Sequence, residues 1–598
     1  MVNIKILKFK QKDSIVCKEL YNYNQNKIEQ YYEKMNGFEN QDKFDEKLNK
    51  NTKKINPPKE QILSQAFQFH SQGNISEAAK FYQYCINQGF NDHRVFSNYG
   101  VLLKSLRKLK EAEFCFRKAI QLNPNYPNAY SNLGIILRDL GKLKEAEFSY
   151  RKAIQLNPNH TNYHYNLGNI LTDLEKLKEA EFSYRKAIQL NPNFAEGHCN
   201  LGNLLKSLGK LKEAEFSYRK AIQLNPNFAE GHCNLGNLLR SLGKLRAAEL
   251  LYVKTIDLDP NFVKAYSYLS TIQSSHKIEK WQTRLLSEDF IKNKSSKEKV
   301  FIYFARANIL HKEKKYASSS KYLQLANNLK LNLKPSNVEY LLNESKKLLF
   351  ESNKKIDNKK ELKNFPQSIF IVGMPRSGST LLESILSMNN NVKDLGEVNI
   401  LEESFLSWKT SKQKLTLAEI YLQKANTHNE ELKSTTNKWL YNYQYAGIIG
   451  SLIPNAKIIH CFRNPLDNIL SIYRANFAEG NQYSSSLVDC AKVYLDQEIV
   501  MTKYKKKFKE KIYNLSYDSL VYNPTKEIKS LISWFSWKWE DKYLSPHLNP
   551  RSVSTASDVQ VRSAINSKSC GSWKNYKELL KPVMEIITQK DKYKELKY

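Results

Sequence analysis

Residues 145–159, EAEFSYRKAIQLNPN, recur without a change at residues 179–193 and 213–227. The copies are 34 residues apart, and the same spacing separates a longer series of prolines: Pro124, Pro158, Pro192, Pro226 and Pro260. Small residues keep this register as well: Gly100, Gly134, Gly168, Gly202 and Gly236; Ala112, Ala146, Ala180, Ala214 and Ala248. Two helices pack closely only where the crossing side chains are small, and proline ends a helix. The first half is therefore predicted to be a stack of helix pairs.

The 34-residue period with these glycines, alanines and prolines resembles the tetratricopeptide repeat, in which each antiparallel helix pair buries its open face on the next. Five clear repeats span residues 93–262. We expect degenerate units around residues 61–92 and 263–278 and a further helix pair over residues 303–329. The predicted architecture is an N-terminal tetratricopeptide α-solenoid over residues 59–350, preceded by a polar segment, residues 1–58.

An asparagine occupies one first-helix position in each clear repeat: Asn98, Asn132, Asn166, Asn200 and Asn234. An amide offers both a donor and an acceptor, so a ladder of them could hold the backbone of an extended peptide without reading its sequence. The array resembles that of the O-linked N-acetylglucosamine transferases, in which such a ladder holds protein substrate. The resemblance implies a protein or peptide partner in the repeat groove. The alternative is that these asparagines cap or bridge neighbouring repeats.

The chain has 598 residues and a formal net charge of +33. Its basic residues are not gathered in one arm or helix, which argues against nucleic acid as the main partner. No segment approaches the ~20 apolar residues of a membrane helix, and no apolar region follows the basic N-terminus, so we expect neither a membrane partner nor a secretory signal. The eight cysteines form no C-x-x-C pair, which favours a reducing, cytoplasmic location over a zinc site or a disulfide framework.

A different pattern follows a polar, lysine-rich linker predicted over residues 351–364. Residues 368–390, SIFIVGMPRSGSTLLESILSMNN, begin with an apolar run typical of a buried parallel strand over 368–373. A turn is predicted over 374–378 and a helix over 379–388. Strand, glycine-bounded loop and helix form a phosphate cradle, because backbone N–H groups and the positive end of the helix dipole converge on an anion.

This loop departs from the G-x-x-x-x-G-K-[ST] loop of kinases and ATPases. Ser379 stands where the lysine should be, although Arg376 supplies positive charge within the loop. We find no clear strand-end aspartate for Mg²⁺, and one arginine with a loop cannot neutralise a triphosphate without metal. A nucleotide with a smaller 5′ anion fits better. An ordinary glycine-containing β–α turn is the alternative.

A second corner of the same kind lies in residues 455–477, NAKIIHCFRNPLDNILSIYRANF. We predict a strand over 457–462, a turn over 463–465 and a helix over 466–477. Arg463 ends the strand, and Ser471 follows eight residues later. An arginine and a hydroxyl suit a second, separate phosphate. A nucleotide with phosphates at both its 5′ and 3′ ends would use both corners.

Four ordered segments carry a family likeness: VGMPRSGSTLLESIL, NAKIIHCFRNPLDNILS, YNLSYDSLVYNP and STASDVQVRSAINSKSCGSWKNY. Together they resemble the sulfotransferases that use 3′-phosphoadenylyl sulfate (PAPS). The chain is most similar to the bacterial fusions of tetratricopeptide repeats with a sulfotransferase and to the related tyrosylprotein sulfotransferases. The resemblance covers about residues 365–581. It implies a P-loop-like α/β sulfotransferase domain with a central parallel sheet over residues 365–598.

The resemblance also implies residue roles, with PAPS as co-substrate and no metal. Glu397 matches the catalytic base, and Lys438 and Ser557 match the residues that stabilise the transition state. The implied cofactor-binding residues are Arg376, Ser377, Gly378, Ser379 and Thr380 at the 5′-phosphosulfate, Arg463 and Ser471 at the 3′-phosphate, Tyr517 near the adenine, and Trp573 with Lys574 in the last motif. Without the resemblance, Glu397 could instead cap a helix beginning near residue 398, and Lys438 could be a solvated surface residue.

The chain departs from the family at three places, one of which is the absence of the usual proline at Ser563 or Ala564. Ser572 stands before Trp573 where relatives carry a basic residue, so only Lys574 remains to replace it. Ala475 stands where relatives carry arginine, and the adjacent Arg474 would point about 100° away on a helix.

The predicted function is transfer of a sulfuryl group from PAPS to an acceptor hydroxyl, with tyrosine in a protein or peptide favoured. The alternative is a repeat scaffold with a degenerate nucleotide-binding domain. A saccharide or a small phenol stays open as acceptor, and the sequence does not give the oligomeric state.

Overall fold

The computed structural model describes residues 59–272, 280–354, 365–410, 415–425, 434–477, 480–553 and 555–597. The predicted polar segment 1–58 and most of the predicted linker lie outside these ranges. The chain divides into two compact units between Pro226 and Asn227. This division falls inside the repeat array, and the domain limits inferred from the sequence stay predictions.

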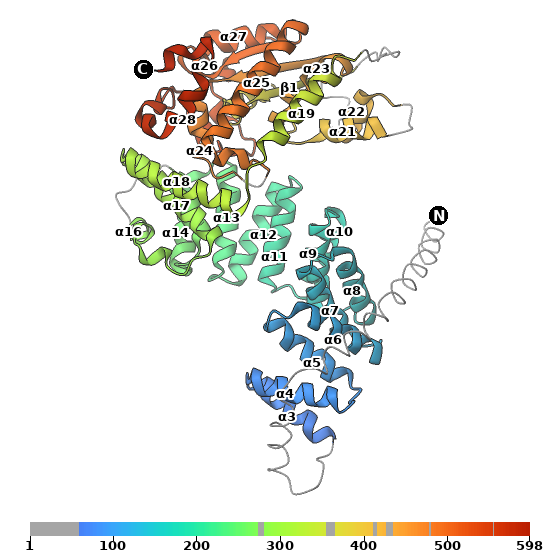
Figure 1. The fold of residues 1–598 in the computed structure, drawn as a ribbon. Coiled ribbons are helices and arrows are strands. Elements are labelled where there is room, and N and C mark those ends of the chain that lie inside the picture. Colours follow the sequence, from blue (N-terminus) through green and yellow to red (C-terminus); the bar gives the residue numbers. More distant parts are fainter. Residues whose placement is uncertain are drawn as a thin grey trace. The chain divides into compact units, whose positions relative to one another are not determined.

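The first unit is a series of antiparallel helix pairs, each packed on the next (Figure 1). The expected degenerate pair at its start is present as α3 and α4. The helices are α3 (Lys59–Ser71), α4 (Ile75–Asn87), α5 (His93–Ser105), α6 (Leu109–Leu122), α7 (Pro127–Asp139), α8 (Leu143–Leu156), α9 (Thr161–Asp173), α10 (Leu177–Leu190), α11 (Ala195–Ser207) and α12 (Leu211–Leu224).

The conserved spacing of glycines has a steric cause. Gly168 on α9 faces the Tyr184 ring on α10, and a Cβ atom there would lie 2.7 Å from that ring. The same pairing recurs between Gly202 and Tyr218. The tyrosine rings are buried and fill the helix crossing, so only a residue without a side chain fits opposite them. This confirms that the repeats depend on small residues where the helices cross.

The second unit begins with the last clear repeat and continues through further helices. The pair predicted over residues 303–329 is present as α17 and α18, whereas the end of the degenerate unit at 263–278 lies outside the described residues. The helices are α13 (Ala229–Ser241), α14 (Leu245–Leu258), α15 (Val263–Thr271), α16 (Lys280–Leu286), α17 (Ser296–Lys312), α18 (Tyr316–Leu333) and α19 (Val338–Glu351).

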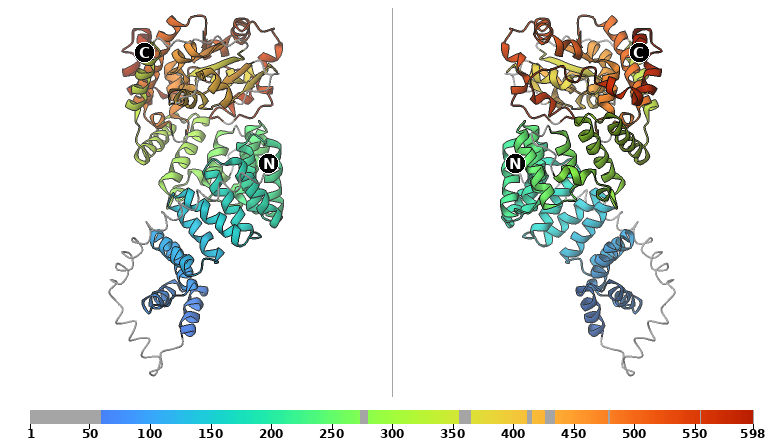
Figure 2. Two further views of the ribbon diagram at one scale, coloured as in Figure 1. Left: turned by 90° about the vertical axis from the view of Figure 1, so that its right-hand side faces the viewer. Right: turned by 90° about the vertical axis from the view of Figure 1, so that its left-hand side faces the viewer.

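A five-stranded parallel sheet, enclosed by helices, follows in the same unit (Figure 2). Its strands are β1 (Gln367–Gly373), β2 (Val392–Asp394), β3 (Ser434–Asn437), β4 (Ala456–Phe462) and β5 (Ile512–Ser516), in the order β2-β3-β1-β4-β5. The surrounding helices are α20 (Ser379–Leu386), α21 (Ile400–Thr410), α22 (Leu417–Ala425), α23 (Ala446–Leu452), α24 (Pro465–Tyr473), α25 (Leu487–Lys507), α26 (Tyr517–Tyr522), α27 (Pro524–Trp534) and α28 (Lys577–Ile587).

Central strand β1 is buried on both faces, as its apolar run predicts. Phe370 and Val372 pack into a core with residues of α21, α22, α23 and α25. Ile369 and Ile371 point to the opposite face and pack with residues of α20 and α27. The predicted solenoid followed by an α/β domain with a central parallel sheet is confirmed.

Helix α24 ends earlier than the sequence pattern suggests. It stops at Tyr473, whereas we expected a helix to residue 477. The Asn327 amide on α18 donates to the Tyr473 carbonyl at 2.9 Å, and Lys330 donates to the Phe477 carbonyl at 2.8 Å. The Asn327 side chain therefore satisfies a carbonyl group at the end of α24 that has no partner within the helix.

The described residues contain no helix with the length and apolar character needed to cross a membrane.

Substituting Gly168→Ala should lower stability by about 1–3 kcal/mol, because the new methyl group would overpack the Tyr184 ring. Helix propensity alone predicts a gain in stability for this substitution, since alanine is favoured over glycine in a helix by about 1 kcal/mol. Denaturant unfolding of both proteins measures the change. The matched control is Asn162→Ala at an exposed position of the same helix, and an equal or higher stability of the Gly168 variant would contradict the steric explanation.

Candidate active site

The sheet register brings together the chemistry-bearing segments that follow its strands. Gly373 of β1 pairs with Cys461 of β4, and Phe462 of β4 pairs with Ser516 of β5. On the other side of β1, Phe370 pairs with Asn437, the last residue of β3. Because all pairs are parallel, the loops that follow leave the same edge of the sheet. Arg376, Glu397, Lys438, Arg463 and Tyr517 all lie shortly after strand ends.

The loop after β1 adopts a conformation that few sequences allow. Gly373 has φ +143°, and a Cβ atom there would lie 2.2 Å from the Cys461 carbonyl oxygen. Gly378 has φ +94°, and its Cβ would lie 2.4 Å from the Tyr517 ring. Arg376 lies between them with φ +66°, which is unusual for a residue with a side chain. Strain of this kind is concentrated at functional sites.

The Arg376 guanidinium joins three parts of the chain. Its Nε donates to the Ser471 hydroxyl on α24, at 3.1 Å. Its Nη1 donates to the Ser557 hydroxyl, and its Nη2 donates to Gln560 Oε1 at 2.6 Å. One planar fork thus connects the first corner, the second corner and residues 555–562.

The second corner is built around Arg463, which is 6% exposed. Its guanidinium lies over the Tyr517 ring, with Cζ 4.7 Å from the ring centroid. Its Nη2 donates to the Ser569 carbonyl at 2.5 Å, and the Tyr517 hydroxyl is 2.9 Å from the Ser569 hydroxyl. The ring, the backbone carbonyl and the guanidinium fix one another, so the cation is held in a defined orientation.

The two corners concentrate positive charge, because the guanidinium groups of Arg376, Arg463 and Arg474 lie near one another. Burial, with the nearby guanidinium groups of Arg463 and Arg474, lowers the pKa of Arg376 to about 10. Two buried polar atoms also lack a partner within the described chain, Ser377 Oγ and Arg463 Nε. Like charges that lie near one another beside unpaired donors suit a polyanion. These residues therefore fit a nucleotide with a phosphate group at each corner.

Lys438 lies at the centre of a charged cluster beside the loop. Its Nζ is 2.7 Å from Glu397 Oε1, 3.6 Å from Glu383 Oε2 and 3.4 Å from the Thr380 hydroxyl. The Lys438 side chain is 0% exposed and that of Glu397 is 45% exposed. Lys438 is therefore not a solvated surface residue. Glu397 does not cap a helix near residue 398, because α21 begins at Ile400 and the carboxylate pairs with Lys438 instead.

The start of α20 completes this region. Ser379 and Thr380, its first two residues, are buried. The Thr380 hydroxyl lies 3.2 Å from the Thr555 hydroxyl, so residues 555–562 also contact the helix start. The first turn of a helix presents backbone N–H groups without intrahelical partners. The predicted 5′-phosphosulfate residues thus form one continuous loop and helix start.

The last motif is held in place by hydrogen bonds from its backbone to helix α24. The Asp467 carboxylate accepts the Gly571 N–H at 2.6 Å and the Trp573 N–H at 2.9 Å. Burial raises the pKa of Asp467 even though these two N–H groups favour its charged form. The Trp573 side chain packs in the hydrophobic core with residues of α24 and α28, and Lys574 is exposed. The contacts predicted for Trp573 and Lys574 stay predictions.

Arg474 is the C-cap residue of α24 and keeps right-handed helical backbone angles. It lies near enough to Arg376 to lower the pKa of that guanidinium, and its own guanidinium lies over the Tyr576 ring at 5.8 Å. Arg474 therefore adds positive charge near the first corner, beside that of Arg376.

Sequence reasoning missed two charged residues behind the site, one buried and one partly buried. Glu383 on α20 is 1% exposed, and its Oε2 lies 3.0 Å from Arg551 Nη1. The same Arg551 nitrogen lies 2.5 Å from Asp394 Oδ2, at the end of β2. The available signal was an acidic residue inside the otherwise apolar run LLESIL. Nothing local marks Arg551, which is 157 residues beyond Asp394 in the chain.

The predicted asparagine ladder lies on successive first helices. Asn98, Asn132, Asn166 and Asn200 lie on α5, α7, α9 and α11 and are half-buried; Asn234 lies on α13, in the second unit. The Asn200 amide donates to the Tyr165 hydroxyl at 2.8 Å and to Asn169 Oδ1 at 3.0 Å. Asn200 therefore bridges to the preceding repeat, as the alternative interpretation expects. A peptide-binding role for the ladder stays a prediction.

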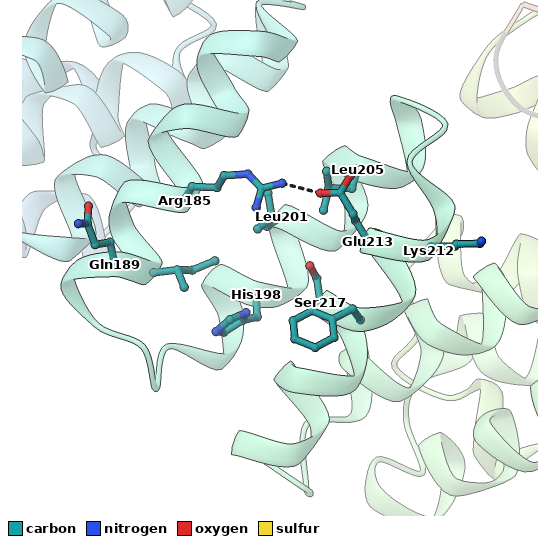
Figure 3. A pocket seen from close by; sticks show the side chains of 10 residues that line it. Arg185, Gln189, His198, Leu201, Leu205, Lys212, Glu213 and Ser217 are labelled. Carbon is teal, nitrogen blue, oxygen red and sulfur yellow. Dashed lines mark hydrogen bonds and ion pairs between the residues drawn. The ribbon is translucent and has the colours of Figure 1, made fainter.

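The first unit also contains a cavity of about 490 Å³ among α10, α11 and α12 (Figure 3). Arg185 and Glu213 pair beside it, with Nη2 and Oε2 2.7 Å apart. His198 lines the cavity, and its Nε2 lies 3.2 Å from the Pro192 carbonyl. Since the charged groups pair with each other, the wall that remains for a ligand is mainly apolar, including Leu201 and Leu205.

Comparisons with known proteins agree with this architecture. Residues 366–541 match the sequence pattern of the sulfotransferase family. Tetratricopeptide-repeat patterns match residues 93–126, 127–160, 168–209, 195–228 and 217–249. The chain joins tetratricopeptide repeats to a sulfotransferase domain.

Three similar proteins illustrate the two parts. An uncharacterized protein of Aquifex aeolicus is 32% identical over 245 residues, which are 37% of this chain and 32% of that protein. A Caenorhabditis briggsae protein, provisionally named a protein-tyrosine sulfotransferase, is 24% identical over 244 residues, 36% of this chain and 82% of that protein. The solved structure of YrrB, a tetratricopeptide-repeat protein described as having an unusual peptide-binding site, is 26% identical, covers 31% of this chain and 97% of its own, and has a TM-score of 0.27. The chain thus spans about a third of the Aquifex relative.

Within the described ranges, no group of three or more histidine, cysteine, aspartate or glutamate side chains is arranged to hold a metal ion.

Proposed function

We propose that the protein transfers a sulfuryl group from PAPS to an acceptor hydroxyl, with tyrosine in a protein or peptide as the favoured acceptor. The observation that carries the proposal is the Arg376 guanidinium, which hydrogen-bonds both Ser471 of the second corner and Ser557 of the last motif. The Arg376 side chain therefore contacts residues predicted to bind the second end of the nucleotide and the transferring group, while Arg376 itself is predicted to bind the first end.

The donor is inferred from the arrangement of charge. PAPS carries a phosphosulfate at its 5′ end and a phosphate at its 3′ position. The loop after β1 and the start of α20 would take the first, and Arg463 with Ser471 the second. The depressed pKa of Arg376 and the unpaired Arg463 Nε support an anion that bridges both corners. The Tyr517 ring packs on Gly378 and lies beneath Arg463. It therefore offers an aromatic face beside the proposed position of the nucleotide.

The proposed chemistry follows from the cluster around Lys438. Sulfuryl transfer needs the attacking and leaving oxygens in line with sulfur, and it needs charge on the leaving group to be stabilised. Glu397, the partly exposed member, accepts the proton of the acceptor hydroxyl. Lys438 is held beside it and next to Thr380, where it meets negative charge on the transferring group. Ser557, fixed by Arg376, supplies a further donor. A phenol with a pKa near ~10 needs only modest help from a carboxylate base.

The acceptor is inferred from the repeats and from the relatives. Tetratricopeptide repeats commonly bind protein or peptide segments, and one relative is provisionally named for protein-tyrosine sulfation. A cytoplasmic, bacterial setting remains part of the same proposal. The competing function is a repeat scaffold with a degenerate nucleotide-binding domain, which the exposed position of Lys574 favours.

Substituting Arg463→Ala should weaken binding of adenosine 3′,5′-bisphosphate by ~30-fold, which corresponds to about 2 kcal/mol for lost charge-assisted hydrogen bonds. Affinity for adenosine 5′-monophosphate should stay unchanged, because this ligand lacks the 3′-phosphate. Titration calorimetry measures both. Lys526→Ala, an exposed lysine on α27, controls for net charge. Equal losses for the two ligands would remove the 3′-specific role, and no binding of the bisphosphate to the unmodified protein would favour the scaffold.

Substituting Glu397→Gln should leave nucleotide affinity intact and reduce kcat by ~10²-fold or more, because the amide keeps the shape but cannot accept the proton. The measurement is turnover of a phenolic acceptor with PAPS. The control is Glu403→Gln, an exposed carboxylate on α21 that pairs with Lys424. Turnover equal to that of the unmodified protein would exclude Glu397 as the base.

Replacing Asn98, Asn132 and Asn166 together by alanine should raise KM for peptide acceptors and leave small phenols unaffected, since only an extended chain would contact the ladder. Steady-state kinetics with both acceptors tests this. A matched triple variant at Asn125, Asn159 and Asn193, exposed asparagines with the same 34-residue spacing, serves as control. An equal change for both acceptor classes would show that the ladder is structural.

A further inference from the structure

The last tetratricopeptide repeat contacts the same chain segment that carries Ser557. Arg240, on α13, pairs with Asp558. Its Nε lies 2.7 Å from Oδ2, and its Nη2 donates to Oδ1 at 2.8 Å. The two side chains are only 14% and 11% exposed. Arg240 thus makes one charge-assisted hydrogen bond to the carboxylate and holds a second guanidinium nitrogen close to its other oxygen.

Backbone groups of the repeat strengthen this contact. The Ser241 carbonyl, at the end of α13, accepts the Val553 N–H at 2.9 Å and Arg562 Nη2 at 2.8 Å. Arg562 also donates to the Asn549 and Arg551 carbonyls, at 2.7 Å and 2.6 Å. Residues 549–553 and 555–562 are therefore held on both sides of Ser557 by the end of one repeat helix.

The other side of this segment forms part of the candidate active site. Ser557 and Gln560 accept hydrogen bonds from Arg376, and Thr555 lies 3.2 Å from Thr380. Asp558 lies between Ser557 and Gln560 in the chain. The residue that pairs with the repeat is therefore flanked by two residues that contact the site. Residues 555–562 include only one short 3-10 turn, Gln560–Arg562. Their position consequently depends on side-chain contacts from both neighbours.

Arg240 marks the difference between two nearly identical repeat helices. Helices α11 and α13 have the same thirteen residues except at one position, where α11 has Lys206 and α13 has Arg240. Lysine offers a point charge, whereas arginine offers a planar fork that matches both carboxylate oxygens. The Arg240 guanidinium also lies over the Tyr268 ring at 5.9 Å, which restricts its orientation. The one substitution in an otherwise duplicated helix is thus at the contact with Asp558.

We propose that Arg240 is a positioning residue for sulfuryl transfer: through Asp558 it holds residues 555–562 so that Ser557 and Gln560 meet Arg376. The proposal rests on the proposed function. In consequence the last repeat is a structural part of the transfer site, in addition to any role of the array in holding an acceptor. Removing one partner leaves the other charge buried without compensation, which is costlier than losing an exposed pair.

Two measurements test the proposal: hydrogen exchange, which does not depend on catalytic turnover, and kcat. Arg240→Ala should speed hydrogen exchange at the Val553 amide and across residues 555–562 by at least ~10-fold, because their anchor is lost. It should also lower kcat by ~10-fold or more for both a peptide and a small phenol, with KM for either acceptor unchanged. Arg240→Lys and Asp558→Asn, which keep more of the local shape, should give smaller changes in the same direction.

A charge exchange and a matched control complete the design. The double variant Arg240→Asp with Asp558→Arg should recover part of the lost kcat, because the two side chains act as a pair. Lys206→Ala, at the equivalent position of α11, should change neither exchange nor kcat. If the unmodified protein is active and Arg240→Lys, Asp558→Asn and Arg240→Ala all retain full kcat, the positioning role is overturned while the proposed function stands. If the unmodified protein transfers no sulfuryl group from PAPS, the proposed function itself is overturned, and the positioning role with it.

Discussion

The parallel register of the sheet is the constraint on which the candidate site depends. Pairing Gly373 with Cys461 and Phe462 with Ser516 directs the loops after β1, β4 and β5 to one edge. That edge then concentrates Arg376 and Arg463; burial and, to a lesser extent, repulsion from Arg463 depress the pKa of Arg376. A protein that holds like charges together keeps a site that is best satisfied by a ligand of opposite charge. The helices and the last repeat support this edge from outside.

Much of the architecture could be predicted because its signals are local. The 34-residue sequence repeat predicts the helix pairs, and the strand–loop–helix pattern around Arg376 predicts the first corner. Family membership of residues 366–541 confirms the sulfotransferase domain. The roles assigned to Glu397, Lys438, Ser557 and the nucleotide-binding residues stay predictions, although the structure places Lys438 beside Glu397 and Ser557 beside Arg376.

The remainder escaped prediction because it depends on contacts between distant parts of the chain. Helix α24 ends at Tyr473, whose carbonyl accepts a hydrogen bond from Asn327, 146 residues earlier. The ion pair of Glu383 with Arg551 spans 168 residues, and that of Arg240 with Asp558 spans 318. No local pattern specifies such partners. The Lys206-to-Arg240 difference was visible in the sequence, but only the structure gives it a meaning.

The near-identity of the internal repeats has an evolutionary consequence. Every clear repeat uses the same glycine-to-ring fit, as between Gly168 and Tyr184, so one unit can neighbour any other copy. Recombination between duplicated stretches of the gene can then insert or delete a whole 34-residue unit in frame. The terminal repeat differs in that its Arg240 also pairs with Asp558. Array length can therefore change among descendants of this gene while the pair of Arg240 with Asp558 is kept.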